Sequence, residues 1–543
     1  MSFSSKDDVK TTIVESIYNE ILSRRSNYFY FISKIMPWSD ESSPPTVSNT
    51  QIDEYETRNQ IITAKRISSS DASFVIPRKN WSANVVYDQF DGNYSASFTS
   101  SSGATSLKSS NFYVLTDEFN VYKVLSNSNG KESNVKPTGT DSTLTSTSDG
   151  YIWKYMYTIP LSLRNRFLTD DVMPVQRSLT NAYFSNGQVS IVTIDNAGIG
   201  YNNSNTTLTV TGDGIGASLT PVVNNNTGSI VDVVIVNPGE GYTHLDIEVV
   251  GSGSSANLFA QLSTGDLDTL QSHVELSAVD GSINAIRVDN SGSNYTSATI
   301  KILGDGNISE ASNANAYPVI SNSNTITEIV VDDPGFGYTH ANVEIIGDGT
   351  NANAIAIISP QNGHGSDAVS ELFADKIMFF STINNERIHE VDVNNDYRQF
   401  GIVKDFKQYD GSSLRKFGNA RVFANSIGTP CFLCNIGTVI DSTGNSLQRD
   451  TVLELNGDSS KLFTIVEVVS GNNQILVNNL HNHDIVANTI FHEANTGTSF
   501  TVSSVDASPT INKFSGDLLF IDNRTKVSYS DQQLVTLRTT LSI

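Results

Sequence analysis

The stretch Pro238-Gly239-Glu240-Gly241-Tyr242-Thr243-His244 recurs almost unchanged as Pro334-Gly335-Phe336-Gly337-Tyr338-Thr339-His340. Each copy follows a run rich in valine and isoleucine and precedes a second such run, which predicts strands on both sides of a glycine turn. Two weaker copies bring the number of units to four, aligned on Tyr201, Tyr242, Tyr295 and Tyr338. The closing turns are Gly212-Asp213-Gly214, Gly251-Ser252-Gly253, Gly304-Asp305-Gly306 and Gly347-Asp348-Gly349.

These repeats predict a β-structured region over residues 189–365. The Asp-Gly pairs predict tight hairpins, because both residues tolerate positive φ. The close match between the second and fourth units indicates a two-fold duplication of a two-unit module. Units of this kind bury their apolar faces against a neighbouring unit.

Most of the remaining chain consists of short β-like runs separated by Ser, Gly and Asn. Examples are residues 112–115, 120–125, 151–159, 451–455, 462–469, 474–477, 518–522 and 534–541. One amphipathic helix is predicted over residues 6–25, with Val9, Ile13, Ile17 and Ile21 as its stripe, Val14 and Leu22 widening it, and Ser5 and Asp8 as a capping box. The predicted fold is mainly β, a multi-domain sandwich or barrel body with an N-terminal helix, interrupted by inserted β-repeat domains.

Composition narrows the classes of partner. The chain has 543 residues, enough for two to four domains, and a formal charge of −23. An acidic protein repels polyanions, so nucleic acid and anionic lipid are not expected partners. No apolar run is long enough to span a membrane and no signal peptide is recognisable, so we expect a soluble, cytoplasmic protein without membrane insertion. The two cysteines exclude a disulfide framework.

Candidate catalytic and metal-binding motifs have simpler interpretations. Cys431 and Cys434 have zinc or redox spacing, but only His481 and His483 lie near them in sequence as further ligands, and a pair of small strand residues is the favoured interpretation. His481-Asn482-His483 lacks the ββα context of a nuclease. The Gly-x-Gly turns lead into strands and not into a helix, so they are not dinucleotide cradles. Asp213, Asp305 and Asp348 offer one carboxylate per turn, which favours turn residues over calcium ligands. His244 and His340 occupy equivalent positions, which favours a hydrogen-bonding role.

Five stretches outside the repeats resemble one family, the dimer-forming baseplate wedge subunit of T-even-type contractile-tailed bacteriophages. They occur in the family's order along the chain. They are Pro37-Trp38-Ser39, Phe74-Val75-Ile76-Pro77-Arg78-Lys79-Asn80-Trp81, residues 149–160 (DGYIWKYMYTIP), Tyr397-Arg398-Gln399 and a closing pattern of Gly516, Asn523, Arg524, Asp531 and Gln532.

The resemblance implies a wedge body formed by residues 1–188, 366–405 and 514–543. Residues 189–365 and 406–513 would be insertions, as in the enlarged forms of phages that infect marine cyanobacteria. It further implies a homodimer that binds other wedge subunits, resides in the virion tail baseplate after assembly in the host cytoplasm, and has no catalytic residue, cofactor or metal. The structural or interface residues would be Trp38, Arg78, Trp81, Tyr151, Trp153, Arg398, Gln399 and Arg524, with Trp153 expected mainly in the core.

Two other functions remain open from the sequence. Polar, acidic repeats suit contacts with sugars, so residues 189–365 could attach tail fibres or bind host-surface glycan as a tail adhesin. Abundant carboxylates leave a polysaccharide depolymerase as a third possibility, because the separation of two acids in space is not visible in a sequence.

Overall fold

The computed structural model describes most of the chain. The described residues are 6–22, 25–175, 188–224, 227–240, 242, 245–262, 265–304, 314–383, 387–389, 391–393, 395–409, 421–436, 447–469, 473–480, 483–496, 498–528 and 535–542. Ser5, His244, Asp305, Gly306, His481, Asn482, Asp531 and Gln532, which the sequence singled out, lie outside them.

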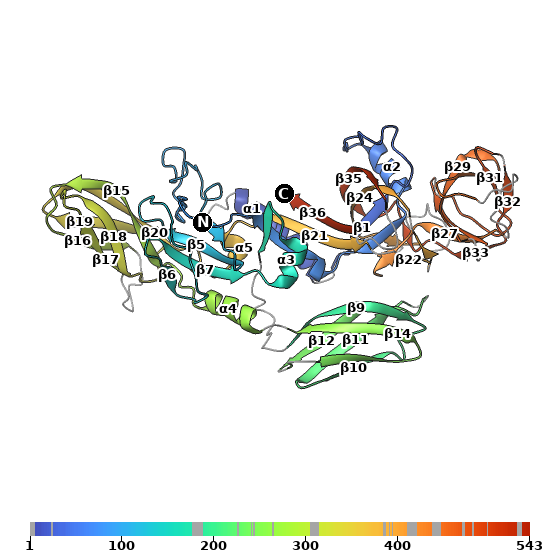
Figure 1. Ribbon diagram of the computed structural model, residues 1–543, viewed down its shortest axis with the longest axis horizontal. Coiled ribbons are helices and arrows are strands. Elements are labelled where there is room, and N and C mark those ends of the chain that lie inside the picture. Colours follow the sequence, from blue (N-terminus) through green and yellow to red (C-terminus); the bar gives the residue numbers. More distant parts are fainter. Residues whose placement is uncertain are drawn as a thin grey trace.

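The fold is mainly β, as predicted, and antiparallel throughout its named sheets (Figure 1). Three sheets form what we call the body. The first has the order β26(Ile427–Gly428)-β2(Thr63–Arg66)-β1(Tyr28–Ser33)-β24(Tyr397–Lys404)-β35(Asp517–Val527). The second has the order β36(Val535–Ser542)-β21(Lys376–Ile383)-β3(Ala72–Pro77)-β8(Val172–Val175). The third has the order β4(Tyr113–Leu115)-β5(Asn120–Ser126)-β7(Ile152–Thr158)-β6(Leu144–Ser146).

A seven-stranded sheet curls at one end of the molecule (Figure 1). Its order is β32(Ser499–Thr501)-β31(Ile490–Glu493)-β28(Val452–Leu455)-β29(Asp458–Val469)-β30(Gln474–Asn479)-β27(Cys431–Asn435)-β33(Ser504–Ala507). Two small ribbons complete this region, β22(Arg387–Ile388)-β23(Val391–Asp392) and β25(Lys407–Gln408)-β34(Ile511–Asn512).

The helices are α1(Lys6–Leu22), α2(Gln51–Asn59), α3(Leu161–Phe167), α4(Gly265–Leu276) and α5(Ala368–Glu371), with a 3-10 turn η1(Ser69–Asp71). The N-terminal helix was predicted, but its buried stripe was only partly right. Val14 and Ile21 are buried, whereas Val9 and Ile13 remain 47% and 41% exposed. A spacing of four residues advances 400° around a helix, so a stripe built on that spacing drifts away from the sheet.

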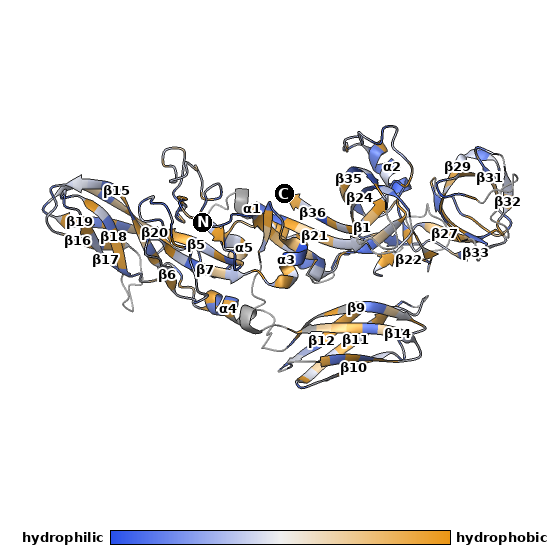
Figure 2. Ribbon diagram, in the orientation of Figure 1, coloured by the Kyte–Doolittle hydropathy of each residue, from blue (hydrophilic) through white to orange (hydrophobic). Residues whose placement is uncertain are grey.

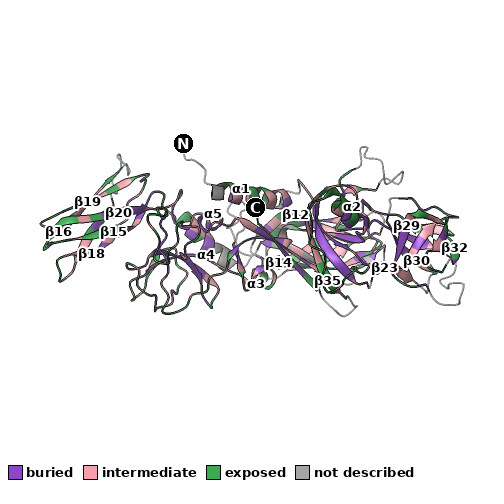
Figure 3. Cartoon of the chain, turned by 90° about the horizontal axis from the view of Figure 1, so that it is seen from above, coloured by how far each residue is buried: buried purple, intermediate pink, exposed green. Residues whose placement is uncertain are grey.

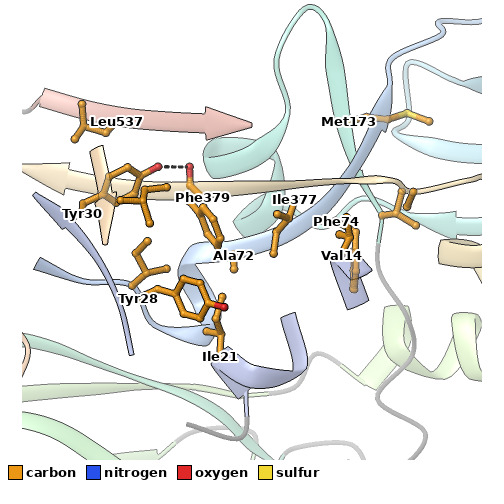
Figure 4. Close-up of a cluster of buried hydrophobic side chains, with 14 of the residues drawn as sticks. Val14, Ile21, Tyr28, Tyr30, Ala72, Phe74, Met173, Ile377, Phe379 and Leu537 are labelled. Carbon is orange, nitrogen blue, oxygen red and sulfur yellow. Dashed lines mark hydrogen bonds between the residues drawn. The ribbon is translucent and has the colours of Figure 1, made fainter. Parts of the chain in front are cut away.

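The core of the body is continuous across sheets that are far apart in sequence. Figure 4 shows Val14 of α1 beside Phe74 of the second sheet and Ile21 of α1 beside Tyr28 of the first. Tyr30 of β1 donates a hydrogen bond of 3.0 Å to the Phe379 carbonyl of β21. Buried residues concentrate in the body, whereas β16(Ala298–Gly304) and β19(Ala341–Gly347) of the repeat region are mostly half-buried or exposed (Figure 3).

Strand β7 carries the aromatic residues that the sequence marked, but they do not alternate regularly. A bulge shifts the β5–β7 register between Val121 and Tyr122. As a result Trp153 and Tyr155 enter one cluster of buried side chains, while Tyr157 enters the main core. A bulge re-aims side chains in this way because the extra residue reverses the alternation of the strand.

The four repeat units pair as two modules, in agreement with the predicted duplication. Module 1 comprises β9(Val189–Ile199), β10(Thr207–Gly212), β11(Ile215–Val223), β12(Ile230–Glu240), β13(Leu245–Val250) and β14(Ser254–Leu262). Module 2 comprises β15(Ile283–Ser293), β16, β17(Asn315–Ile320), β18(Ile326–Asp333), β19 and β20(Thr350–Ile358). Their strands mix hydrophobic and hydrophilic residues (Figure 2).

The prediction that the Gly-x-Gly turns close hairpins is wrong. β10 pairs with β13 and β11 pairs with β12, so Gly212-Asp213-Gly214 joins strands of two different sheets. The turn before β20 does the same, because β19 pairs with β16 and β20 with β15. The Gly-x-Gly segments that the structure describes in full, at residues 212–214, 251–253 and 347–349, are corners of a sandwich.

Each tyrosine of a module packs against the corner of the other unit. A Cβ on Gly253 would overlap the Tyr201 ring, and a Cβ on Gly214 would overlap the Tyr242 ring. Tyr295 covers Gly349 in the same manner. In the three corners that the structure describes in full, the second glycine is therefore required by an aromatic ring, and in module 1 the exchange of rings locks the two units together.

A second structural feature, a side-chain hydrogen bond to a turn glycine, is shared by the four units and precedes each tyrosine. In all four units an Asn or Asp side chain accepts the amide hydrogen of a glycine two residues later, at 2.9–3.0 Å. The four glycines have φ between 56° and 69°, where a side chain is disfavoured. The pairs are Asn196–Gly198, Asn237–Gly239, Asn290–Gly292 and Asp333–Gly335.

We expect Gly349→Ala to destabilise module 2. The new methyl group would overlap the Tyr295 ring and lie 2.6 Å from the Ser293 carbonyl oxygen, and overpacking costs about 1–3 kcal/mol. Hydrogen–deuterium exchange should show faster exchange in β15–β20 and unchanged exchange in β1 and β24. Gly92→Ala is the matched control, since its Cβ would meet no atom within 4 Å. Unaltered protection of β20 in Gly349→Ala would refute the ring-and-glycine lock.

Candidate functional site at the junction of three segments

The structure divides the eight residues singled out from the sequence into two groups. Trp38, Arg398, Gln399 and Arg524 meet at one end of the first body sheet, where the loop after β1 crosses β24 and β35. We call this group, with Glu41 and Asn523, the junction site. Arg78, Trp81, Tyr151 and Trp153 lie around the third sheet.

The junction site is built on hydrogen bonds that join three distant segments. The Trp38 indole N–H donates to the Arg524 carbonyl at 2.8 Å. The Trp38 amide and the Arg398 Nε both donate to Glu41 Oε1, at 2.9 and 2.6 Å. The Arg398 guanidinium also donates to the Ile35 carbonyl at 2.6 Å, and Arg398 itself is buried. A planar guanidinium is suited to bridging a carboxylate and a carbonyl in one plane.

Gln399 extends this network to the loop before α2. Its side-chain amide donates to Asn523 Oδ1 at 2.7 Å, and Asn523 donates to the Pro45 carbonyl at 2.9 Å. On the outer side, the Lys34 amino group lies 4.8 Å from the centre of the Trp38 ring. Burial lowers the pKa of Lys34. The loop that carries Trp38 is thus fixed at both of its ends.

Exposed apolar side chains lie next to the junction site, on α2 and the loop before it. Ile52 is 69% exposed, and Val47 and Tyr55 are also exposed. Ile52 and Tyr55 are three residues apart and therefore share a helix face. Thr50 begins the helix by accepting the Asp53 amide hydrogen at 3.2 Å. Figure 1 shows α2 projecting from the edge of the body, so this face is open to a partner.

The second group of residues is structural. Tyr151 and Trp153 have no exposed surface and stack with ring centroids 5.3 Å apart, and Tyr87 packs edge-on against Trp153. A side chain without exposed surface makes no direct contact with a partner. Both side chains lie in the core of this structure.

Arg78 and Trp81 fasten the connection between the second and third sheets. The Arg78 guanidinium donates to the Thr169 carbonyl and to Asn80 Oδ1, both at 2.9 Å. The Trp81 amide donates to the Leu115 carbonyl of β4 at 2.9 Å, and its indole N–H donates to Ser133 Oγ at 3.2 Å. Both side chains are half-buried and bind within the chain.

The motifs that could have been catalytic are explained by the fold. Cys431 and Cys434 are free, lie three apart on β27 and enter different clusters of buried side chains. Burial raises the pKa of each thiol to about 12, which leaves no thiolate at neutral pH. Asp348 accepts the amide hydrogens of Thr296 and Ser297 at 2.9 and 3.1 Å, and these bonds with that of the Thr296 hydroxyl lower its pKa to about 2. It is a turn residue, as favoured from the sequence.

The sequence did not reveal a buried ion pair between Lys123 of β5 and Glu371 of α5. Glu371 also accepts the Gly365 and Asp367 amide hydrogens at 2.8 and 3.1 Å. His364 lies beside the pair, and burial followed by the charges of Lys123 and Lys154 holds its pKa well below the usual value. The partners lie far apart along the chain, so only the fold brings them together.

Lys513 is a second buried cation that the sequence did not reveal. Its amino group donates to the carbonyls of Asn59 and Asn479 and, at 3.3 Å, to Asn478 Oδ1. It therefore joins the end of α2 to β30 of the seven-stranded sheet. Burial lowers the pKa of Lys513 to about 7, and these three acceptors are neutral oxygens that do not offset the cost of the buried charge as a carboxylate would.

No protein-family model matches the chain, and the search of curated proteins finds no significant match. Within the described ranges, no three His, Cys, Asp or Glu side chains are grouped so that they could hold a metal ion. No helix in the described part of the chain is long and apolar enough to cross a membrane.

We expect Arg398→Met to weaken the body at β24. The substitution removes the guanidinium from Glu41 and from the Ile35 carbonyl, a loss of about 2 kcal/mol. Opening free energies from hydrogen exchange at β24 amides would measure it. A double-mutant cycle with Glu41→Gln should give a coupling of about 1 kcal/mol, since the two side chains share one hydrogen bond. Strictly additive effects would mean that the pair contributes nothing.

Lys513 makes a specific contribution to the pH dependence of stability. An unfolded lysine has a pKa near 10.4, whereas that of Lys513 in the fold is about 7. Between these values the unfolded chain binds the proton and the folded chain does not, so stability rises with pH by up to about 1.4 kcal/mol per unit. Below pH 7 Lys513 is protonated in both the folded and the unfolded state. The folded state then bears the full cost of burying the charge, and this group no longer changes stability with pH.

Comparison with Lys513→Met isolates this contribution, because every other titrating group is common to both proteins. In urea unfolding, the stability of the wild type minus that of Lys513→Met should increase from pH 7 to pH 9.5. A difference that is independent of pH would contradict the assignment.

Proposed function

We propose that the chain is a non-catalytic structural subunit of the baseplate wedge of a contractile-tailed bacteriophage. It forms a homodimer, binds other wedge subunits and resides in the virion tail after assembly in the host cytoplasm. In the proposed role, its interfaces repack between discrete arrangements when host attachment releases the tail sheath.

The junction site is the observation that carries the proposal. Three of the five stretches that resemble the wedge family, around Trp38, Arg398 and Arg524, lie far apart along the chain. In the fold they form one hydrogen-bonded group. A chance likeness of short motifs does not require them to meet, whereas a shared body does.

The other two stretches support the same body. Residues 149–160 supply β7, and residues 74–81 run from β3 into the contact with β4. The Leu115 amide donates to the Lys79 carbonyl at 2.7 Å, and the Trp81 amide donates to the Leu115 carbonyl, so two hydrogen bonds join these segments. Under the proposal, the repeat modules and the seven-stranded sheet are additions to this body, at residues 189–365 and 406–513.

The apolar face of α2 is the surface through which the proposed subunit would bind a neighbour. It is exposed, lies beside the junction site and is fixed to the body by the stacking of Tyr55 on Phe514, with centroids 5.3 Å apart. A tyrosine that remains exposed on a rigid element, such as Tyr55, is typical of the residues that dominate an interface.

Reconstitution with purified wedge subunits of the same phage tests this proposal. The full chain should elute as a dimer and enter a wedge complex. Ile52→Glu should weaken that assembly about tenfold or more, because it places a charge at the centre of an apolar contact. Val486→Glu is the matched control, since Val486 is 64% exposed on the seven-stranded region.

A monomer that binds none of the wedge subunits would overturn the proposed function. Equal losses for Ile52→Glu and Val486→Glu would show that α2 is not the contact.

A further inference from the structure

The two repeat modules present equivalent faces, so the residues on these two faces can be compared position by position. Each module is a sandwich of a larger and a smaller layer. We call one surface of the larger layer, the surface that points away from the core of the module, the outer face. In module 2 this face includes Arg287 and Ile355, which are paired in register across β15 and β20. In module 1 the corresponding register pair is Thr193 and Phe259, across β9 and β14.

The outer face of module 2 is docked on the body. Arg287 forms an ion pair with Asp91, which is fully buried, and a second with Asp289 at 2.6 Å. The Phe98 ring covers the guanidinium at 3.7 Å from its centre. Asn129 of the body donates to the Thr327 carbonyl on the neighbouring strand β18. An arginine clamped between a carboxylate and an aromatic ring is a strong anchor.

The outer face of module 1 lacks the arginine and exposes its apolar side chains. Thr193 stands eight residues before Tyr201, as Arg287 stands eight before Tyr295. Val236 is 63% exposed and Phe259 is 56% exposed. Val234, which lies on β12, is also exposed. From the body, Arg66 reaches the edge of this face and binds Asp232 at 2.9 Å.

Charge indicates which partner fits this face. No lysine or arginine occurs between Arg177 and Arg287, whereas module 1 alone carries six acids, Asp195, Asp213, Asp232, Glu240, Asp246 and Glu248. Module 2 supplies its own cations, Arg287 for the outer face and Lys301, which lies 4.0 Å from Glu344 on the opposite face. Module 1 has no cation to place between Asp195 and Asp232.

We propose that the outer face of module 1 is a docking surface for a basic polypeptide segment of another subunit, with an arginine or lysine beside an apolar side chain. The cation would take the place that Arg287 occupies in module 2, near Asp195, which stands two residues after Thr193 as Asp289 stands two after Arg287. The apolar group would cover Phe259 and Val236. Asp232 already has a cation, Arg66 of the body, and so marks the edge of the proposed site. This inference does not depend on the baseplate assignment.

An extended peptide of alternating valine and arginine, labelled with fluorescein, is a suitable probe for the full-length chain. Fluorescence anisotropy should show binding that weakens with salt, because charge attraction contributes to it. Phe259→Ser should weaken it about tenfold by removing apolar contact. Asp195→Asn should do the same by removing the carboxylate that would face the cation.

Two controls separate this site from general attraction to an acidic protein. Glu248→Gln removes a carboxylate from the opposite face of module 1 and should leave the affinity unchanged. A valine–glutamate peptide of the same length should not bind. No binding of the arginine peptide, equal losses in all three variants, or binding that Phe259→Ser and Asp195→Asn leave unchanged would each overturn the proposal. Displacement by oligosaccharides but not by salt would identify a glycan site instead.

Discussion

Strand β24 is the constraint on which the body depends. It is buried from Tyr397 to Val403 and pairs with β1 on one side and β35 on the other, so residues near 30, 400 and 520 form one sheet. At its centre Gly401 leaves no room for a side chain, because a Cβ there would overlap the Phe520 carbonyl and the Phe31 ring. A strand buried on both faces stabilises whatever lies beside it, since its neighbours bury apolar surface against it.

This arrangement explains how long segments can leave the body without disrupting it. The seven-stranded sheet is formed by residues between β24 and β35, and the repeat modules lie between β8 and β21. After each excursion the chain forms a strand that pairs with a strand of the body. β21 pairs with β3, and β35 pairs with β24. Arg58 reinforces one return by donating to the carbonyls of Lys513, Ser515 and Gly516 just before β35.

The sequence predicted what depends on local pattern. The β class, the positions of strands such as β5, β28 and β36, and the pairing of the repeats into two modules followed from apolar runs and recurring glycine and tyrosine. The short helices α2 to α5 were missed. The corners were mistaken for hairpins, because Asp-Gly describes the turn and not the strands that it joins. The asparagine or aspartate two residues before each turn glycine is visible in the sequence and is a signal for the side-chain hydrogen bond found there.

The candidate site was half predictable. Trp38, Arg398, Gln399 and Arg524 could be singled out by resemblance, but nothing in the sequence placed them together. Glu41, Lys123, Glu371 and Lys513 could not have been chosen, because a buried charge is recognised only from its surroundings. Tyr151 and Trp153 were also singled out by resemblance, and a large aromatic side chain serves a core as well as an interface.

The two modules also show that one fold can serve two purposes. Module 2 uses an arginine on its outer face to join the body, whereas module 1 leaves the same face open and acidic. A density map of the assembly that contains this chain would test the central claim most directly. Our account predicts paired copies in the baseplate wedge, with the junction site intact and α2 against a neighbouring subunit. Placement of the chain in a fibre, or a body in which Trp38, Arg398 and Arg524 lie apart, would contradict it.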